Sequence, residues 1–199
     1  SLAFRQGEQQ RSKMKWEDMN EHVCSVARAR SVVGQRWTLL IIRDAFKGTR
    51  RFEGFHKNLG VTRHRLAERL AMLVDEGVLT KVAYSTHPER FEYRLTRKGL
   101  GLYPVLMTLS QWGDQWLSDE HGAPMHYWHS GCASVCEPVL SCSECGEPLR
   151  PEEVSSKHGA EISEYVAHLK QHGLPIPTDA QLPKMAGEHR KTKTKGAVR

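Results

Sequence analysis

Two short amphipathic segments joined by the turn LGVT constrain the fold of this chain more than any other feature of its sequence. The second segment, VTRHRLAERLAMLVDEGVL, starts at Thr62, a residue type that caps helices, and Gly77 closes it. Leucines recur in it at the i, i+4 and i+7 spacing of a helix with one buried face, namely Leu66, Leu70 and Leu73. The first segment, RRFEGFHKNLG, carries a similar apolar face and ends at Gly60. Two short helices joined by so tight a turn predict a helix-turn-helix.

A β-hairpin is predicted immediately after these helices. The stretches LTKVAY and RFEYRLT are rich in Val, Tyr, Phe and Thr, and the turn residues of STHPE separate them. Because a helix-turn-helix followed by a hairpin is a winged helix, the expected fold class is mainly α with a small β-hairpin wing. A small C-terminal, zinc-ribbon-like cysteine module is expected in addition.

Longer helical patterns flank this unit. The first covers residues 24–45 with a break near Gly34, and the second covers residues 97–120. The second pattern has a larger apolar face than so small a domain needs for its own core, although the face could simply cover that core. We expect the two patterns to contribute to a dimer interface. Its predicted residues are Trp37, Leu106, Leu109, Trp112 and Trp116.

The net charge of +6 is confined to the middle of the chain. Residues 43–98 contain 13 basic and 7 acidic side chains, an excess equal to that of the whole chain, and the remaining residues cancel. A positive segment can be an ordinary solvated surface. One that coincides with a helix-turn-helix suggests a polyanionic partner.

The helix that begins after Thr62 is expected to contact DNA bases. Since its leucines face the core, the exposed first turn and the opposite side of the helix present polar groups. An arginine there can bond bidentately to guanine in the major groove, and a glutamate can accept from cytosine or hold an arginine in place. The alternative is that these side chains are ordinary surface residues. The predicted contact residues are Thr62, Arg63, His64, Arg65 and Glu68.

Further DNA contacts are expected around this helix. His87 and Arg90 belong to the tip of the wing, where an arginine can enter a narrow minor groove or instead pair with a nearby glutamate. Arg50, Arg51 and Lys57 are placed for phosphate contacts, which add salt-dependent affinity without reading sequence. The predicted partner is double-stranded DNA.

Several motifs occur in a fixed order: an early cysteine, VVGQRWTLLIIRD, RRFEGF, LAERLAMLVDEGVL, HPERFEYRLTRKG and LYPVL followed by WG. Over residues 24–118 they resemble the HxlR-type winged helix-turn-helix transcriptional regulators of bacteria and archaea. The resemblance implies a homodimer built from the first and last helices, with one recognition helix on each half-site of a pseudo-palindromic operator. Some members of that family sense electrophiles or oxidants through a cysteine near the start of the first helix, which corresponds to Cys24 here. The alternative for Cys24 is packing at the dimer interface.

A histidine and four cysteines cluster between residues 129 and 145. They include two pairs of soft ligands at x2 spacing, which suits tetrahedral zinc. A structural site is therefore expected, with Cys136 as an alternative to the histidine. Unmetallated thiols, or a reversible disulfide that joins the last two cysteines, are the alternative; a catalytic zinc would need an open coordination position. The predicted zinc ligands are His129, Cys132, Cys142 and Cys145.

Four regions are expected along the chain. They are a flexible arm at residues 1–20, an HxlR-type DNA-binding and dimerisation domain at 21–120, a His/Cys-rich module at 121–150 and a polar, largely disordered basic tail at 151–199. No stretch has the apolar length of a membrane span, and the first residues lack a signal peptide, so we expect a cytoplasmic protein with no membrane partner.

These features predict a sequence-specific DNA-binding transcriptional regulator rather than an enzyme, responsive to a redox, electrophile or small-molecule signal. The alternative is a zinc or thiol redox protein that uses the winged helix as a protein-docking or non-specific DNA-binding scaffold. The confinement of the positive charge to the helix-turn-helix and wing favours the regulator.

Overall fold

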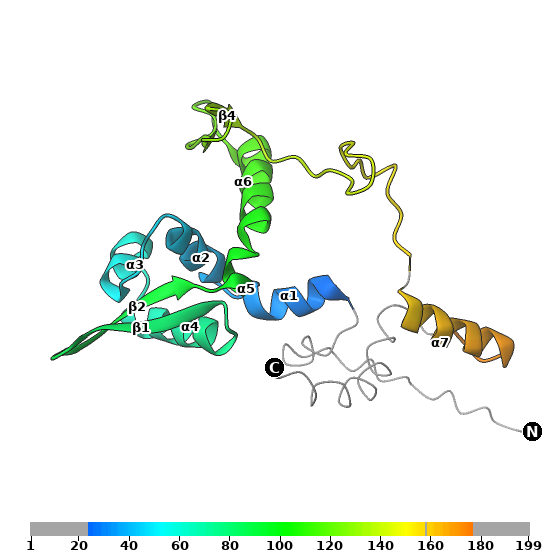
Figure 1. Ribbon diagram of the computed structural model, residues 1–199, viewed down its shortest axis with the longest axis horizontal. Helices are drawn as coiled ribbons and strands as arrows, with labels where there is room; N and C mark the ends of the chain where they lie inside the picture. The colour runs from blue at the N-terminus through cyan, green and yellow to red at the C-terminus, as the bar shows by residue number, and fades with distance from the viewer. Residues whose placement is uncertain (1–23, 158, 177–199) are drawn as a thin grey trace, which may run out of the picture. The chain divides into compact units, whose positions relative to one another are not determined.

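The computed structural model describes residues 24–157 and 159–176 (Figure 1). The chain divides into two units, one formed by residues 36–167 and the other by the segments on either side of it. The arm expected at residues 1–20 and the end of the expected tail, from residue 177, lie outside the described residues.

Three helices form the framework of the larger unit. They are α2 (Thr38–Phe46), α3 (Phe52–Leu59) and α4 (Arg63–Asp75). Gly60 ends α3 with φ +61, a conformation that suits glycine, and its amide donates to the carbonyl of His56. Thr62 then caps α4, accepting a hydrogen bond on its hydroxyl oxygen from the Arg65 amide at 3.4 Å. The predicted helix-turn-helix is confirmed.

A small apolar core holds these helices together. It is completed by Val78 and Leu79, at the start of the hairpin, and each fully buried large side chain in it is worth about 1.5–3 kcal/mol relative to exposure. The fully buried side chains of the three helices include Ile41, Ile42, Phe55, Leu66, Leu70 and Leu73. The three predicted leucines of α4 therefore face the core, which leaves the other side of α4 to solvent.

The wing is an antiparallel hairpin of β1 (Leu79–Thr86) and β2 (Glu89–Leu95) that extends away from the helices (Figure 1). Both strands are longer at the tip than the sequence suggested, because Thr86 pairs with Glu89 and only two residues remain between the strands. The base of the wing is tied to the segment before α3, since the Tyr93 amide donates to the Arg50 carbonyl at 2.7 Å.

The prediction of a single helix over residues 97–120 is wrong in one respect, because the structure contains two helices there. They are α5 (Arg97–Leu100) and α6 (Tyr103–Leu117). Pro104 lies in the first turn of α6. Proline has no amide hydrogen to donate and its ring clashes with the carbonyl four residues earlier, so it favours the start of a new helix at this point.

The first expected helix is likewise divided, at the predicted break. Its two parts are α1 (Ser25–Val33), which belongs to the smaller unit, and α2. Gly34 is the C-cap of α1, and Trp37 precedes α2 with a left-handed φ of +76. In the C-terminal region, the structure contains α7 (Ala160–Gln171), within the segment expected to be a polar, largely disordered tail.

The His/Cys segment, residues 121–150, contains little regular structure. A short hairpin joins β3 (Tyr127–His129) to β4 (Ser134–Cys136), and a bridge between Ser141 and Pro148 closes the CSECG turn. None of residues 121–150 is buried. Across the described ranges, no helix combines the length and apolar character needed to cross a membrane.

Candidate nucleic-acid interface

The exposed side of α4 is polar and begins at the helix N-terminus. Thr62, Arg63, His64, Arg65 and Glu68 are all exposed. The buried leucines occupy the opposite side, so the predicted base-contacting residues share the surface of one capped helix. A helix presented in this way has the form that enters a major groove, with its N-terminal residues toward the bases.

Arg63 is held by α3 in this structure. Its guanidinium bonds to both carboxylate oxygens of Glu53, at 2.6 and 3.0 Å, and lies 5.0 Å from the centre of the Phe52 ring. The hydrogen bond from Arg63 holds the pKa of Glu53 below its ordinary value. To contact a base or phosphate, Arg63 must exchange this carboxylate for the nucleic acid.

Arg65 is the exposed cation of this surface with no carboxylate partner among the described residues. The neighbouring His64 lies 3.3 Å from Glu68 across one helical turn. This contact orients Glu68 along the helix and leaves the Arg65 guanidinium open to solvent. Arg65 therefore has the clearest geometry for bidentate recognition of a guanine.

The three predicted phosphate contacts differ in their surroundings. Arg51 lies 3.4 Å from Glu92 of β2 and stacks over the Tyr84 ring at 4.4 Å. Hydrogen bonds from Arg94 and then Arg51 hold the pKa of Glu92 below its ordinary value. The side chains of Arg50 and Lys57 are exposed. Arg51 therefore joins the helices to the wing, whereas Arg50 and Lys57 present open cations.

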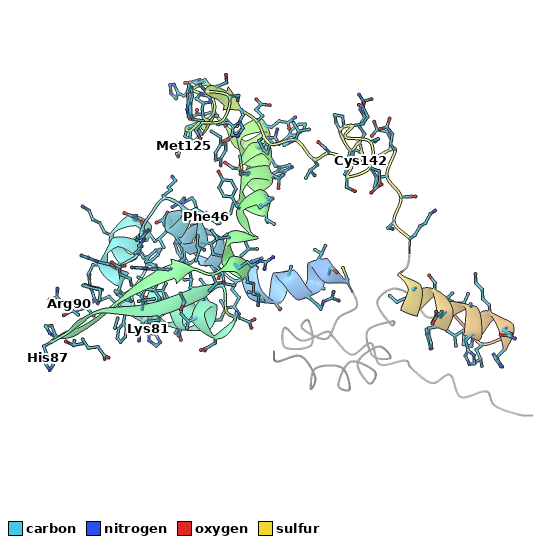
Figure 2. The ribbon with its side chains drawn as sticks, in the orientation of Figure 1. Phe46, Lys81, His87, Arg90, Met125 and Cys142 are labelled. Carbon is cyan, nitrogen blue, oxygen red and sulfur yellow. The ribbon has the colours of Figure 1, made fainter. Side chains whose placement is uncertain are left out.

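The tip of the wing carries His87 and Arg90, which Figure 2 shows at the far end of the hairpin. The His87 ring lies 3.2 Å from the Thr86 hydroxyl, and Arg90 is paired in register with Ser85. Within the described residues no carboxylate pairs with Arg90, although Glu89 and Glu92 are close in sequence. The wing tip therefore offers a cation at the position where a minor-groove contact is expected.

Sequence reasoning missed the residues that set these cations in place. Glu53 fixes Arg63, and Glu92 joins Arg51 to Arg94. Lys81, whose ammonium lies 3.8 Å from the centre of the Phe91 ring, adds a positive side chain to the wing. Glu53 is 10 residues from Arg63 and Glu92 is 41 residues from Arg51, so only the tertiary structure could identify these two pairs. Glu92 and Arg94 are neighbours on β2.

The apolar stripe of α6 is largely uncovered. Contact between the rings of Phe46 and Tyr103, 5.0 Å apart, joins α6 to α2 near its beginning. Further along, Leu109, Trp112 and Trp116 are 45%, 54% and 66% exposed. Leu106 and Trp37, the other predicted interface residues, are half-buried. The stripe runs along one helix face and is a candidate interaction surface.

Cys24 is exposed and occupies the N-cap position of α1. Its thiol therefore lies at the protein surface, at the start of this helix.

The predicted zinc ligands lie in two pairs. His129 Nδ1 is 3.3 Å from Cys132 Sγ. The backbone amides of Cys145 and Glu144 donate to the sulfur of Cys142, which lowers the pKa of that thiol. Considering only the part of the chain that the structure describes, no three His, Cys, Asp or Glu side chains gather as a metal site would require. The structure therefore forms each pair and does not bring the pairs together.

Comparison with known proteins assigns the winged helix. Residues 32–121 match the family described as HxlR-like helix-turn-helix. The HTH-type transcriptional regulator Mb3122 of Mycobacterium bovis is 45% identical over 135 residues, which cover 68% of this chain and 85% of that protein. A second HTH-type transcriptional regulator, from Synechocystis, is 32% identical over 100 residues, 50% of this chain and 74% of that protein. The family match ends at residue 121, whereas the mycobacterial match covers 135 residues of this chain. The mycobacterial match therefore includes positions beyond the end of the family match.

Solved structures agree with the assignment. The crystal structure of PA1607, described as a candidate transcription factor, has a TM-score of 0.64 and 34% identity, covering 70% of this chain and 98% of that one. A second candidate transcription factor, PA1374 from Pseudomonas aeruginosa, has a TM-score of 0.52 and 30% identity over 71% of this chain and 97% of that one. These relatives are regulators, which supports a role other than catalysis. The chain belongs to the HxlR-like helix-turn-helix family of transcriptional regulators.

Proposed function

We propose that this transcriptional regulator acts in the cytoplasm as a homodimer that binds a pseudo-palindromic operator in double-stranded DNA. The observation that carries the proposal is the exposed side of α4, where Arg65 lies open beside a capped helix N-terminus. The net charge supports it, because the whole excess of +6 falls within residues 43–98, which contain the helix-turn-helix and the wing.

In the proposed complex, α4 enters the major groove and Arg65 donates to a guanine edge. Arg50 and Lys57 bind flanking phosphates, and Arg90 reaches the adjacent minor groove from the wing. Arg63 leaves Glu53 or remains bound to it as a brace between α3 and α4. The base contacts supply specificity, and the phosphate contacts supply affinity that falls with added salt.

The apolar stripe of α6 is proposed as the homodimer interface. Leu109, Trp112 and Trp116 lie on one face of a single helix, and each is at least 45% exposed. Clustered exposed tryptophans are typical of surfaces that a partner covers, and a second copy presents the same stripe. A dimer built in this way sets the separation of the two α4 helices, and hence the spacing of the half-sites.

A signal would act by changing that separation. The exposed N-cap position of Cys24 supports a thiol-based signal, since oxidation or alkylation there adds bulk or charge at the start of α1. We assign no catalytic role to the chain. The rival function, in which the winged helix is only a docking scaffold for a thiol or zinc enzyme, does not explain why the positive excess is confined to residues 43–98.

The DNA contacts are tested by comparing the effects of one arginine-to-alanine change and one lysine-to-alanine change on binding to a selected operator. Arg65→Ala is expected to cost about 1–3 kcal/mol of binding free energy and to relax base preference at one position in each half-site. Lys57→Ala is the matched control, expected to weaken binding to all sequences and to lower the salt slope by about 1. If Arg65→Ala weakens operator and random DNA equally, Arg65 is a phosphate contact and the proposed base readout is wrong.

The interface is tested by sedimentation of Trp112→Asp, which is expected to convert a dimer to a monomer. Asp114→Asn, on the opposite side of α6, is the control and is expected to remain dimeric. A monomeric wild-type chain at micromolar concentration would contradict the proposed assembly.

A further inference from the structure

We propose that residues 121–150 fold around one tetrahedral Zn²⁺ ion held by His129 Nδ1 and the thiolates of Cys132, Cys142 and Cys145. The proposal rests on the geometry of this segment and is independent of DNA binding.

The first pair of ligands already has the separation that one metal ion imposes. Zinc lies about 2.3 Å from a cysteine sulfur and about 2.0–2.1 Å from a histidine nitrogen, so two such ligands at a tetrahedral angle are about 3.5 Å apart. The observed distance from His129 Nδ1 to Cys132 Sγ is 3.3 Å. Gly131 lies between them, and a side chain there would meet the His129 ring at 3.1 Å. The turn after β3 therefore accommodates this pair of ligands.

The second pair occupies a turn built to present sulfur. Gly146 adopts φ +78, and its amide donates to the Cys142 carbonyl at 2.9 Å. Closing bonds join the Cys142 amide to the Glu147 carbonyl and the Leu149 amide to the Leu140 carbonyl, each at 2.8 Å. This closed turn holds Cys142 and Cys145 at x2 spacing, at which two thiolates can bind one zinc ion.

Cys136 is set apart from the His129–Cys132 pair by its place in the hairpin. It pairs in register with Tyr127, whereas His129 pairs with Ser134 beside the turn that carries Cys132. Cys136 thus lies at the opposite end of the short β3–β4 ladder from Cys132. This arrangement favours His129 as the fourth ligand and leaves Cys136 as a natural control.

A metal explains how so short a segment can hold a structure. None of its residues is buried, and Trp128, Val139 and Leu140 remain 61–65% exposed. Units below about 40 residues rarely build a sufficient apolar core and need a metal or disulfides instead. The structure does not bring the two pairs together, so the proposed ion requires the five residues between Cys136 and Cys142, which reach at most about 17 Å, to fold back.

A disulfide accounts for fewer of these observations. Joining Cys142 to Cys145 would use the second pair alone and would give no role to the contact of His129 with Cys132. A histidine cannot take part in a disulfide, whereas it is a common zinc ligand. A single metal ion therefore gives both preformed pairs a role.

The test uses the full chain, purified without chelator and dialysed, with zinc measured by mass spectrometry and the site then examined by Co²⁺ substitution. We expect one zinc per chain, and for Co²⁺ the intense visible bands of a tetrahedral site with sulfur-to-cobalt charge transfer. Cys142→Ser and His129→Ala are expected to lose stoichiometric metal, and Cys136→Ser is expected to keep it.

Loss of metal in these variants could also come from misfolding, so a variant that should gain signal serves as a control. His129→Cys is expected to keep one Co²⁺ per chain and to strengthen the charge-transfer band, because a fourth thiolate replaces the imidazole. Unchanged zinc in Cys142→Ser, or loss of zinc in Cys136→Ser with retention in His129→Ala, would overturn the ligand assignment. A metal-free wild-type chain with a Cys142–Cys145 disulfide would overturn the zinc site, while operator binding by that same protein would leave the proposed function standing.

Discussion

The winged helix at residues 36–100 and the His/Cys segment at residues 121–150 are both small, yet they are organised by different means. Buried apolar side chains such as Leu70 and Phe55 fix the helices of the first, and its polar residues are then free to line one surface. The second has no buried residue, and its hydrogen-bonded turns carry ligand-type side chains. The difference indicates that the predicted DNA-contacting residues depend on a core beneath them, whereas the His/Cys segment would depend on the metal ion proposed for its ligands.

The largest expected effect comes from removing the proposed zinc ion, which should act on the His/Cys segment and spare the winged helix. Treatment of the full chain with a strong chelator should unfold the His/Cys segment, because structural zinc contributes about 10–16 kcal/mol of binding free energy in zinc-finger peptides. Limited proteolysis should then cut within residues 121–150, while the melting temperature of the winged helix stays unchanged. Equal resistance to protease with and without chelator would remove the distinction between the regions.

A core truncation should act on the winged helix alone. Leu70 is fully buried, so Leu70→Ala is expected to lower the free energy of unfolding by about 2–5 kcal/mol. Leu140 is 61% exposed, and Leu140→Ala is expected to change it by about 0.5 kcal/mol or less. Chemical denaturation followed by helical circular dichroism measures both. Similar losses in the two variants would mean that the His/Cys segment shares the core of the winged helix.

Two glycine-to-alanine substitutions compare how tightly α5 and α6 are packed against their surroundings. A Cβ added at Gly99 of α5 would collide with the carbonyl oxygen of Val78, so Gly99→Ala is expected to cost about 1–3 kcal/mol of stability. Gly113 of α6 has open space around the same position, and Gly113→Ala should stabilise by up to about 1 kcal/mol. Thermal unfolding of both variants gives the comparison, and a neutral Gly99→Ala would show that α5 can move away from β1.

The smallest expected effect concerns the ion pair that braces α3 against α4. The bond from Arg63 lowers the pKa of Glu53 in the folded state, so the stabilisation is present above the ordinary value of 4.5 and is lost as pH falls through the lower folded value. The stability difference between wild type and Glu53→Gln should therefore be small at neutral pH and vanish in acid. A difference that grows as pH falls would contradict this sign.

The regular elements were predictable where one local pattern decided the structure. The leucine spacing of α4, its Thr62 cap and the Gly60 stop each rest on a few neighbouring residues, and the structure confirms them. The break before α6 could also have been predicted, because Pro104 is visible in the sequence. The two-residue turn of the wing could not, since it depends on the pairing of Thr86 with Glu89 rather than on composition.

The candidate site was predictable as a set of residues but not as a set of contacts. The sequence indicated which side of α4 is polar. It did not distinguish Arg63, which Glu53 holds, from Arg65, which lies open among the described residues. Such pairing depends on how α3 packs against α4, and no spacing within either helix encodes it. The ligand pairs of the His/Cys segment were predictable because each is formed within a single turn.

The measurement that tests the central claim most directly is selection of DNA ligands from a random duplex library by the purified chain at near-physiological salt, with and without a thiol oxidant. If α4 reads bases, the wild-type chain should enrich a pseudo-palindrome with a guanine in each half-site. The same selection with Arg65→Ala should no longer favour that guanine. If the enrichment disappears only under oxidant, the proposed thiol-based signal is supported as well. No enriched sequence in either condition would contradict the assignment of α4 as a base-reading helix.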